Sequence, residues 1–402
     1  MEENKRIAEE EEEEVWSWGA GTEGQLGTEK LQDEHQPQLL RHHLSLSSFG
    51  PLSSLSCGGA HVIALTPGGR VLTWGRGTSG QLGHGEMVSS SQPKAVESLE
   101  GYVITHVSAG WNHSGFVSET GCLFTCGDGS FGQLGHGDYL SQCSPEKVSY
   151  FDSSHVEQIA CGMRHSLVLG KDHLGNQVHG FGSGKRGQLG ISYERVRSVN
   201  LPQTAMGLDN VQIVSIYANG DHSAALCAEG RLYTWGRGFN GASDMHVPWS
   251  VNTYLSFSHA ALGWNHALLL SGDGDVFMLG SYGHGILTDP LMTTHVQHMD
   301  EESDKNALWR IPGLNGIEVL QIASGAEHSA LVTDDGSVMT WGWGEHGQLG
   351  LGNTIDQPEP RVVSFGKSLA QRHLVSRVYC GSGFTYAIRT PGADSRISVG
   401  SI

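Results

Sequence analysis

Long apolar runs are missing from this sequence of 402 residues. No run approaches the roughly 20 residues that a membrane-spanning helix needs. The longest candidate, 260–270, is interrupted by Trp264, Asn265 and His266. Residues 9–14 are all glutamate, at a place where a secretory signal carries an apolar segment. We therefore expect no membrane association and an intracellular protein, in the cytoplasm, the nucleus or both.

Positive charge is also scarce. The chain has 24 Lys and Arg against 42 Asp and Glu, which gives a formal net charge of −18. A chain with this balance is repelled at long range by phosphate backbones and by anionic membrane surfaces. We expect no direct contact with nucleic acid, and a protein partner instead.

Cysteines are few and unpaired in pattern: there are 7, with no CxxC spacing. Cys57, Cys161 and Cys380 each precede a glycine at one equivalent position, which predicts small buried side chains. Cys122 and Cys126 fall four apart on a predicted strand and face the same side. Two packed thiols are favoured there over a redox or metal pair, so no metal and no cofactor are expected.

Glycine, in contrast, is abundant, with 57 residues at regular places in a repeat. The best copy of the repeat runs from Trp74 to Gly83 and ends in Gly-Gln-Leu-Gly. Full copies begin at Trp18, Trp74, Cys126, Phe181 and Trp341, and worn copies begin at Trp235 and Leu279. Seven units of roughly 50 residues predict a repeat architecture in one closed body.

Each unit has two further parts. An apolar run leads through a tight turn to a histidine, at His61, His113, His165, His222, His266 and His328, with Phe384 in the seventh unit. A glycine turn and a strand then precede each repeat loop, and a proline follows the loop before the next strand, at Pro37, Pro93, Pro145, Pro202, Pro248 and Pro358. Short strands joined by glycine turns, with no long helical pattern, predict an all-β chain.

Seven such units arranged radially form a seven-bladed β-propeller. The first unit begins with its Trp-Gly strand, and the last has no such strand after 378–388. We therefore expect 15–19 to pair with the C-terminal strands and close the ring, which removes an open sheet edge. The predicted domains are an acidic disordered tail at 1–13, the propeller at 14–390 and a C-terminal tail at 391–402. Residues 295–312 are expected to form a polar insert on a loop.

Several repeated residues are best explained as structural. One histidine per unit places these rings too far apart to share a metal ion, so hydrogen bonds within each blade are expected. Trp18, Trp74, Trp235 and Trp341 share one position, where they are expected to wedge adjacent sheets together. The GxGxxG pattern lacks the helix and parallel strand of a dinucleotide site. No arrangement of nucleophile, base and acid can be argued from spacing, so hydrolytic catalysis is not supported.

The residues just before each histidine differ from unit to unit, which is typical of a surface free to vary for function. They are expected on turns at one rim of the ring. Trp111 and Trp264 are candidate interface anchors, although folding of their rings onto an adjacent blade explains them equally well. The predicted partner-binding rim comprises Trp111, Asn112, Met163, Arg164, Asp221, Trp264, Asn265 and Glu327.

Two motifs that recur in phase, WGxGxxGQLG and CGxxHSxAL, cover 15–390, and in them the chain resembles the regulator of chromosome condensation family. That resemblance implies a seven-bladed propeller. Members include a guanine-nucleotide exchange factor for the GTPase Ran and a plant ultraviolet-B photoreceptor, so the fold does not choose the function.

The resemblance bears on single residues. In the exchange factor an acidic residue in this type of turn helps to displace nucleotide, and Asp221 stands at the matching place. In the photoreceptor the turns read Gly-Trp-Arg-His-Thr in three successive blades. Here two turns carry Trp, they are not in neighbouring blades, and Asn112 and Asn265 replace the arginines, so photoreception is disfavoured.

The sequence thus favours a protein-interaction propeller that binds a protein partner through one rim. Guanine-nucleotide exchange on a small GTPase is the alternative that stays open, with Asp221 central to it. The oligomeric state is not determined by the sequence.

Overall fold

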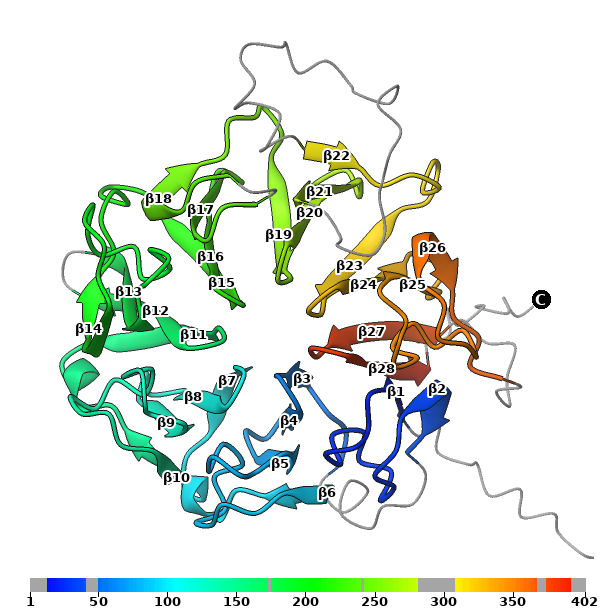
Figure 1. Cartoon of the computed structure of the whole chain (residues 1–402), viewed down its shortest axis with the longest axis horizontal. Coiled ribbons are helices and arrows are strands. Elements are labelled where there is room, and N and C mark those ends of the chain that lie inside the picture. The colour runs from blue at the N-terminus through cyan, green and yellow to red at the C-terminus, as the bar shows by residue number, and fades with distance from the viewer. Residues whose placement is uncertain are drawn as a thin grey trace, which may run out of the picture.

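Seven antiparallel sheets stand radially around one axis in the computed structural model, which describes residues 13–40, 50–172, 175–239, 242–280, 308–366 and 374–391 (Figure 1). Each sheet has four strands, and the described residues include two short 3-10 segments, η1 (Glu97–Leu99) and η2 (Ser149–Phe151). The predicted all-β, seven-bladed propeller is confirmed.

We number the blades I to VII by the order of their inner strands, and give the strands of each from the axis to the perimeter. Blade I contains β3 (Ser54–Cys57), β4 (His61–Leu65), β5 (Val71–Gly75) and β6 (Ser90–Ala95). Blade II contains β7 (Ile104–Ala109), β8 (His113–Ser118), β9 (Leu123–Gly127) and β10 (Gln142–Lys147). Blade III contains β11 (His155–Cys161), β12 (His165–Asp172), β13 (Gly175–Ser183) and β14 (Ser198–Thr204).

The other four blades repeat this plan. Blade IV contains β15 (Ile213–Asn219), β16 (His222–Cys227), β17 (Leu232–Gly236) and β18 (Met245–Ser250). Blade V contains β19 (Phe257–Leu262), β20 (His266–Ser271), β21 (Val276–Gly280) and β22 (Leu308–Arg310). Blade VI contains β23 (Val319–Ser324), β24 (His328–Thr333), β25 (Val338–Gly342) and β26 (Gln357–Val362). Blade VII contains β27 (Leu374–Cys380), β28 (Phe384–Pro391), β1 (Glu14–Gly19) and β2 (Glu34–Leu39).

Blade VII closes the ring by joining strands from both ends of the chain. β1 pairs antiparallel with β28, with Trp16 opposite Ala387 and Glu14 opposite Arg389. Glu13, which the sequence assigned to the tail, accepts a hydrogen bond from the Leu52 amide at 2.8 Å and lies 3.3 Å from the Arg377 guanidinium. The expected closure is confirmed, while residues 1–12 and 392–402 of the predicted tails lie outside the described residues.

Two details of the sequence analysis were wrong. The prolines do not precede a strand; they lie inside the outermost strand of their blade, at Pro37, Pro93, Pro145, Pro202, Pro248, Pro358 and Pro360. Since proline has no amide hydrogen, it belongs on a strand whose outer edge faces solvent, and it protects that edge from pairing with another chain. The insert expected at 295–312 also contains a strand, β22, while 295–307 lie outside the described residues.

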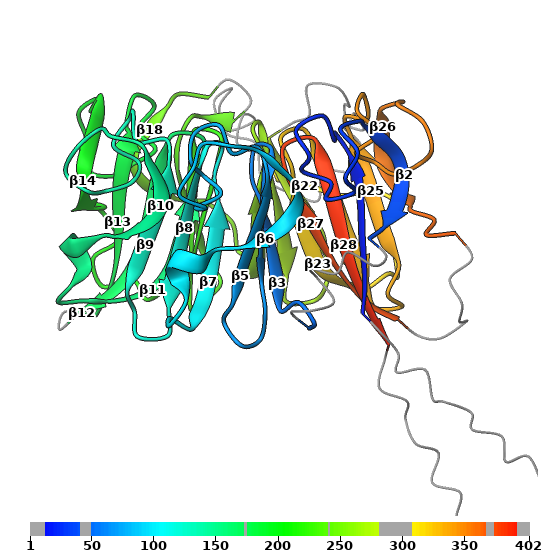
Figure 2. The same cartoon turned by 90° about the horizontal axis from the view of Figure 1, so that it is seen from below.

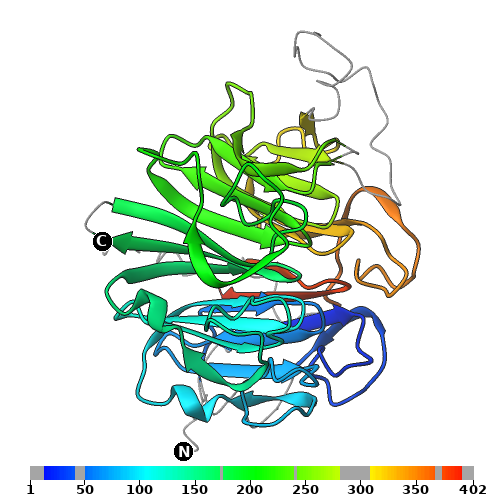
Figure 3. The same cartoon turned by 60° about the vertical axis from the view of Figure 1, so that its left-hand side comes forward.

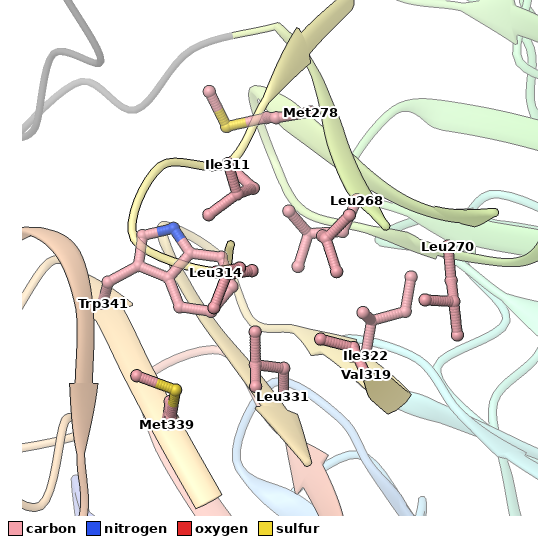
Figure 4. Close-up of a cluster of buried hydrophobic side chains, with 11 residues drawn as sticks. Leu268, Leu270, Met278, Ile311, Leu314, Val319, Ile322, Leu331, Met339 and Trp341 are labelled. Carbon is pink, nitrogen blue, oxygen red and sulfur yellow. The ribbon is translucent and has the colours of Figure 1, made fainter. Parts of the chain in front are cut away.

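The hydrophobic core lies between neighbouring blades. In Figure 4, Leu268 and Met278 from blade V meet Leu331 and Trp341 from blade VI. The indole nitrogen of Trp18 donates to the Gln348 carbonyl of blade VI at 2.9 Å, and that of Trp235 donates to the Gln188 carbonyl of blade III at 2.9 Å. The repeated tryptophans therefore do wedge adjacent sheets together, as predicted.

The repeated histidines connect neighbouring blades, which corrects the expectation of bonds within each blade. His61 Nε2 lies 2.9 Å from the hydroxyl of Ser114 in the next blade. Three further histidines make the same hydrogen bond to a serine of the next blade, and His328 makes it to a threonine. The pairs are His113–Ser166, His165–Ser223, His266–Ser329 and His328–Thr385. His222 faces Ala267 at the corresponding place and donates to the Trp264 carbonyl at 2.6 Å. The hydroxyl is thus part of the junction between blades.

These hydroxyls also fix which imidazole nitrogen carries the proton. The Ser114 hydroxyl donates to the Gln81 carbonyl at 2.7 Å, so it accepts from the Nε2–H of His61. Ser166, Ser223 and Thr385 donate in the same way to Gln133, Gln188 and Gln348. The rings are buried, and desolvation lowers the pKa of His61, His165, His266 and His328 to about 3 and that of His113 to about 4. All five are therefore neutral at pH 7.

The lowered histidine pKa values predict steep acid unfolding. The unfolded chain takes up protons near pH 6.5, whereas the folded chain resists them until pH 4 or below. Stability is therefore complete above about pH 6.5 and falls as the pH drops, by about 2 kcal/mol per histidine at pH 5. Urea unfolding followed by circular dichroism at pH 7 and pH 5 measures this loss. The double variant His328→Phe with Thr385→Val should lose less stability between pH 7 and pH 5, by the contribution of one histidine. Equal stability of the unsubstituted chain at both pH values would contradict the prediction.

The seventh junction offers a second test, because Phe384 and Val62 pack together where the other junctions pair a polar ring with a neighbour. Phe384→His alone buries an imidazole N–H against a valine and should cost about 3 kcal/mol. Adding Val62→Ser supplies the acceptor and should recover about 1 kcal/mol or more in a double-mutant cycle of unfolding free energies. Strict additivity of the two changes would show that ring and hydroxyl do not interact.

Candidate functional site

The variable turns before the histidines all lie on one face of the disc. Successive strands of a blade are antiparallel. The turn after the first strand and the glycine-rich loop after the third therefore emerge on the same side of the disc, which Figure 2 views edge-on. We call this side the rim face. It carries all eight predicted site residues: Trp111, Asn112, Met163, Arg164, Asp221, Trp264, Asn265 and Glu327.

Trp111 and Trp264 meet over the axis of the ring. Their ring centroids are 5.3 Å apart with an interplanar angle of 46°, although the two residues belong to blades II and V. Both side chains are half-buried. Each ring lies over a glycine of the preceding blade: a Cβ added at Gly59 would stand 2.9 Å from the Trp111 ring, and one at Gly220 would stand 3.2 Å from the Trp264 ring. Each indole therefore covers a glycine of the neighbouring blade, as one of the two explanations expected, and stays partly exposed; its role as an interface anchor stays a prediction.

Beneath this pair runs a central cavity with a volume of about 410 Å³. Small and polar residues of the inner strands line it, among them Ser56, Ser108 and Ser324. Cys57 and Cys380 also line it and are half-buried, not fully buried as expected, whereas Cys161 is buried. Burial raises the pKa of all three thiols, so they stay protonated and unreactive.

Hydrogen bonds between neighbouring turns hold the rim face in one shape. The Gly59 amide donates to the Gly110 carbonyl at 3.0 Å, and the Trp111 amide donates to the Gly162 carbonyl at 3.1 Å. Equivalent bonds join Met163 to Gly220, Trp264 to Ala326, Ala326 to Ser382 and Ser382 to Gly58. Backbone positions around the rim are thus fixed by the ring itself, while the side chains are free to differ.

The turn that carries Asp221 differs in sequence from the other six turns. Blade IV has Asn219 where the other turns have glycine, and the following Gly220 adopts a φ of +54°. This Asn-Gly pair is typical of a tight hairpin that requires the left-handed conformation. The half-buried Asp221 carboxylate accepts a hydrogen bond from the Gln188 side chain of blade III at 2.9 Å, so its orientation is set by a buried neighbour.

The other charged rim residues are also held by neighbours. The exposed Arg164 guanidinium lies 4.9 Å from the centre of the Phe131 ring in blade II, a cation–π contact. The Asn265 amide donates to the Glu327 carboxylate at 3.3 Å. The sequence has Asn112 and Asn265, and no arginine, directly after the two tryptophans of the central pair.

Sequence reasoning missed a second variable ring just outside the first. In the six blades where the residue after the Trp-Gly or equivalent pair is described, its amide donates to the carbonyl of the last residue of the turn, as Arg76 does to Ala60, Arg237 to Asp221 and Trp343 to Glu327. Arg76 and Trp343 are half-buried and Arg237 is exposed. Their variation from unit to unit directly after an invariant glycine was the signal that could have revealed them.

The described ranges hold no group of three or more His, Cys, Asp or Glu side chains placed to bind a metal ion. Cys122 and Cys126 share one apolar cluster, as expected of packed thiols. No helix among the described residues is long and apolar enough to cross a bilayer.

Comparison with known proteins agrees with this architecture. The RCC1-like domain model matches residues 11–387. The ultraviolet-B receptor UVR8 of Arabidopsis thaliana is 31% identical over 348 residues, which cover 83% of this chain and 74% of that one. The secretion-regulating guanine nucleotide exchange factor of Bos taurus is 29% identical over 396 residues, which cover 93% of this chain and 82% of that one.

A third relative, the E3 ubiquitin-protein ligase HERC2 of Homo sapiens, is 30% identical over 94% of this chain, which spans only 6% of that protein. Among solved structures, Prp20p of Saccharomyces cerevisiae superposes with a TM-score of 0.79 at 25% identity and covers 96% of this chain and 93% of its own. That structure is described together with the binding of Prp20p to Gsp1p and histones.

The contact between Trp111 and Trp264 predicts that the two residues are energetically coupled. Stacked or tilted aromatic pairs contribute about 0.5 to 1.5 kcal/mol beyond their buried area. Trp111→Ala and Trp264→Ala should therefore each cost little stability, and the double variant should cost less than their sum by about that amount. Chemical denaturation of the four proteins measures the coupling. Trp249→Ala combined with Trp111→Ala serves as the additive control, because Trp249 is exposed on the outermost strand of blade IV, far from the axis.

Proposed function

Because the chain belongs to the family of RCC1-like domains, we propose that it is a protein-interaction propeller that binds a protein partner through its rim face. The proposal places it in the cytoplasm, the nucleus or both, as the sequence led us to expect. The observation that carries it is the Trp111–Trp264 pair at the centre of that face, with rings 5.3 Å apart and half-exposed.

A central aromatic anchor surrounded by polar residues is the usual anatomy of a binding hot spot. Tryptophan contributes a large contact area with few rotatable bonds, and these two indoles are already oriented by each other and by the glycines beneath them. The hydrogen-bonded turns supply a support that needs no ordering when a partner arrives. Low ordering cost favours affinity without a large interface.

The charges around the anchor have both signs. Arg76, Arg164 and Arg237 share the face with Asp221 and Glu327. A mixed surface on a chain of net charge −18 favours a protein with its own mixed surface over a polyanion such as nucleic acid. This supports a protein partner and gives no support to direct binding of nucleic acid.

Guanine-nucleotide exchange on a small GTPase is the second candidate, and Asp221 favours it. Its carboxylate projects from a turn unlike the other six, and the Gln188 side chain holds it in position. Exchange requires a surface that stabilises the nucleotide-free GTPase by disturbing its phosphate and Mg²⁺ site, which a fixed carboxylate could do. The similarity to the secretion-regulating exchange factor and to Prp20p supports the same idea. Photoreception finds no such support, because Asn112 and Asn265 stand where arginines would be needed.

Partner capture by the full chain tests the first proposal. The double variant Trp111→Ala and Trp264→Ala should lower the captured amount of a partner by about tenfold or more, because a hot-spot residue typically contributes about 2 kcal/mol. Asp209→Arg, an exposed change on the opposite face, should leave capture unchanged. If the tryptophan variant still captures the partner and Asp209→Arg does not, the interface lies on the face opposite the rim face, which contradicts the proposal.

Release of a fluorescent guanine nucleotide from a panel of small GTPases tests the second. If exchange is the function, stoichiometric chain should accelerate release from one member, and Asp221→Ala should remove most of that acceleration while leaving the melting temperature nearly unchanged. No acceleration from any GTPase, in a preparation that still captures its partner, would discard exchange and keep the interaction role.

A further inference from the structure

The flank of blade IV differs from the flanks of most other blades. One register position on the outermost strand of every blade lies opposite the residue before the Trp-Gly pair or its equivalent. Polar residues hold this position in blades VII, I, II, III and VI: Gln38, Lys94, Glu146, Gln203 and Arg361. Blade IV has Trp249 there, opposite Thr234, and blade V has the half-buried Trp309, opposite Met278.

Trp249 is 62% exposed, and Tyr254, in the loop after β18, is 89% exposed. Met206 of blade III is also exposed, and its neighbour Gly207 lies beside Pro248. We call the four exposed residues Met206, Trp249, Asn252 and Tyr254 the blade IV flank. Strand β18 lies on the left-hand side of the ring in Figure 1, the side that Figure 3 turns forward. Aromatic and methionine side chains are enriched in interfaces relative to the rest of the protein surface.

The flank is also free of charge. Residues 245–272 and 198–208 contain no Asp, Glu, Lys or Arg, in a chain in which 16% of residues are charged. Two ion pairs lie near its border: Arg186 lies 3.2 Å from Asp244, and Arg231 lies 3.6 Å from Glu229. The exposed indole of Trp249 and amide of Asn252 can donate and accept hydrogen bonds with a copy of themselves.

From these observations we infer that the blade IV flank is a self-association surface, and that its occupant is the same flank of a second copy of this chain. Two chains of net charge −18 repel each other, so they can associate only where like charges do not meet. A two-fold axis brings identical patches together, which an uncharged, hydrogen-bonding aromatic surface tolerates and a charged one does not. Pro248 on the edge of β18 excludes pairing of strands, so side chains must make the contact.

This surface lies on the side of the disc and leaves the rim face open. A dimer formed through it would present two rim faces. Loss of self-association would therefore not require loss of partner binding, nor the reverse. The inference does not depend on the function proposed for the rim face.

Sedimentation equilibrium of the full chain over a range of micromolar concentrations tests the inference. We expect a monomer–dimer equilibrium, weakened at least tenfold by Trp249→Lys. Val362→Lys, on the outer strand of blade VI at a residue that is 61% exposed, is the matched control and should leave the equilibrium unchanged. Circular dichroism of both variants confirms that the fold is intact, which the exposure of both residues leads us to expect.

Salt dependence gives an independent readout. Raising sodium chloride from about 0.05 M to about 0.5 M screens the residual repulsion between two acidic chains and should strengthen the dimer. A purely monomeric chain, a dimer that Trp249→Lys leaves intact, or one that Val362→Lys dissociates equally would each overturn the inference. So would a dimer that Trp111→Ala dissociates while Trp249→Lys does not, since that dimer would use the rim face.

Discussion

The bond between a buried imidazole and a hydroxyl of the next blade is the interaction on which the ring depends. Each blade alone would leave an apolar face and several polar groups in contact with water. The histidine, the hydroxyl and the glutamine carbonyl form a chain of two hydrogen bonds between neighbouring sheets, which satisfies these polar groups inside the junction. Since a neutral imidazole is required, the same junctions that hold the ring together lose stability as the pH falls.

The sequence predicted the fold well because repetition averages out local ambiguity. Seven copies of one pattern, with the missing strand at one end present at the other, left few topologies to choose from. What it could not predict was which partner each repeated group would find. The hydrogen bonds of the histidines were expected inside a blade, but the acceptor hydroxyl lies about one unit further along the chain. No spacing rule distinguishes a bond within a blade from a bond between blades. The prolines were misplaced for a related reason, because a proline outside a strand and one on its outer edge look alike in sequence.

The rim residues were placed on the correct face, yet their contacts were not foreseen. Trp111 and Trp264 lie in blades that are not neighbours, and the sequence alone gave no reason to bring them together. They meet because the ring is narrow enough at its axis for two indoles to reach across. Gly59 and Gly220 make room for them, and only the structure reveals that function of the two glycines. Whether these residues bind a partner stays a prediction.

The pairing of β1 with β28 has a consequence for how the chain acquires its structure. The two strands that complete blade VII are separated by six entire blades, so the contact order of the final step is about as high as the chain allows, and loop closure over such a length is slow. Until β28 has formed, β1 lacks its partner, and a nascent chain must hold that unsatisfied strand away from its neighbours. Synthesis of the propeller therefore passes through a stage at which chaperone protection matters most, and that stage lasts until nearly every residue of the ring has emerged from the ribosome.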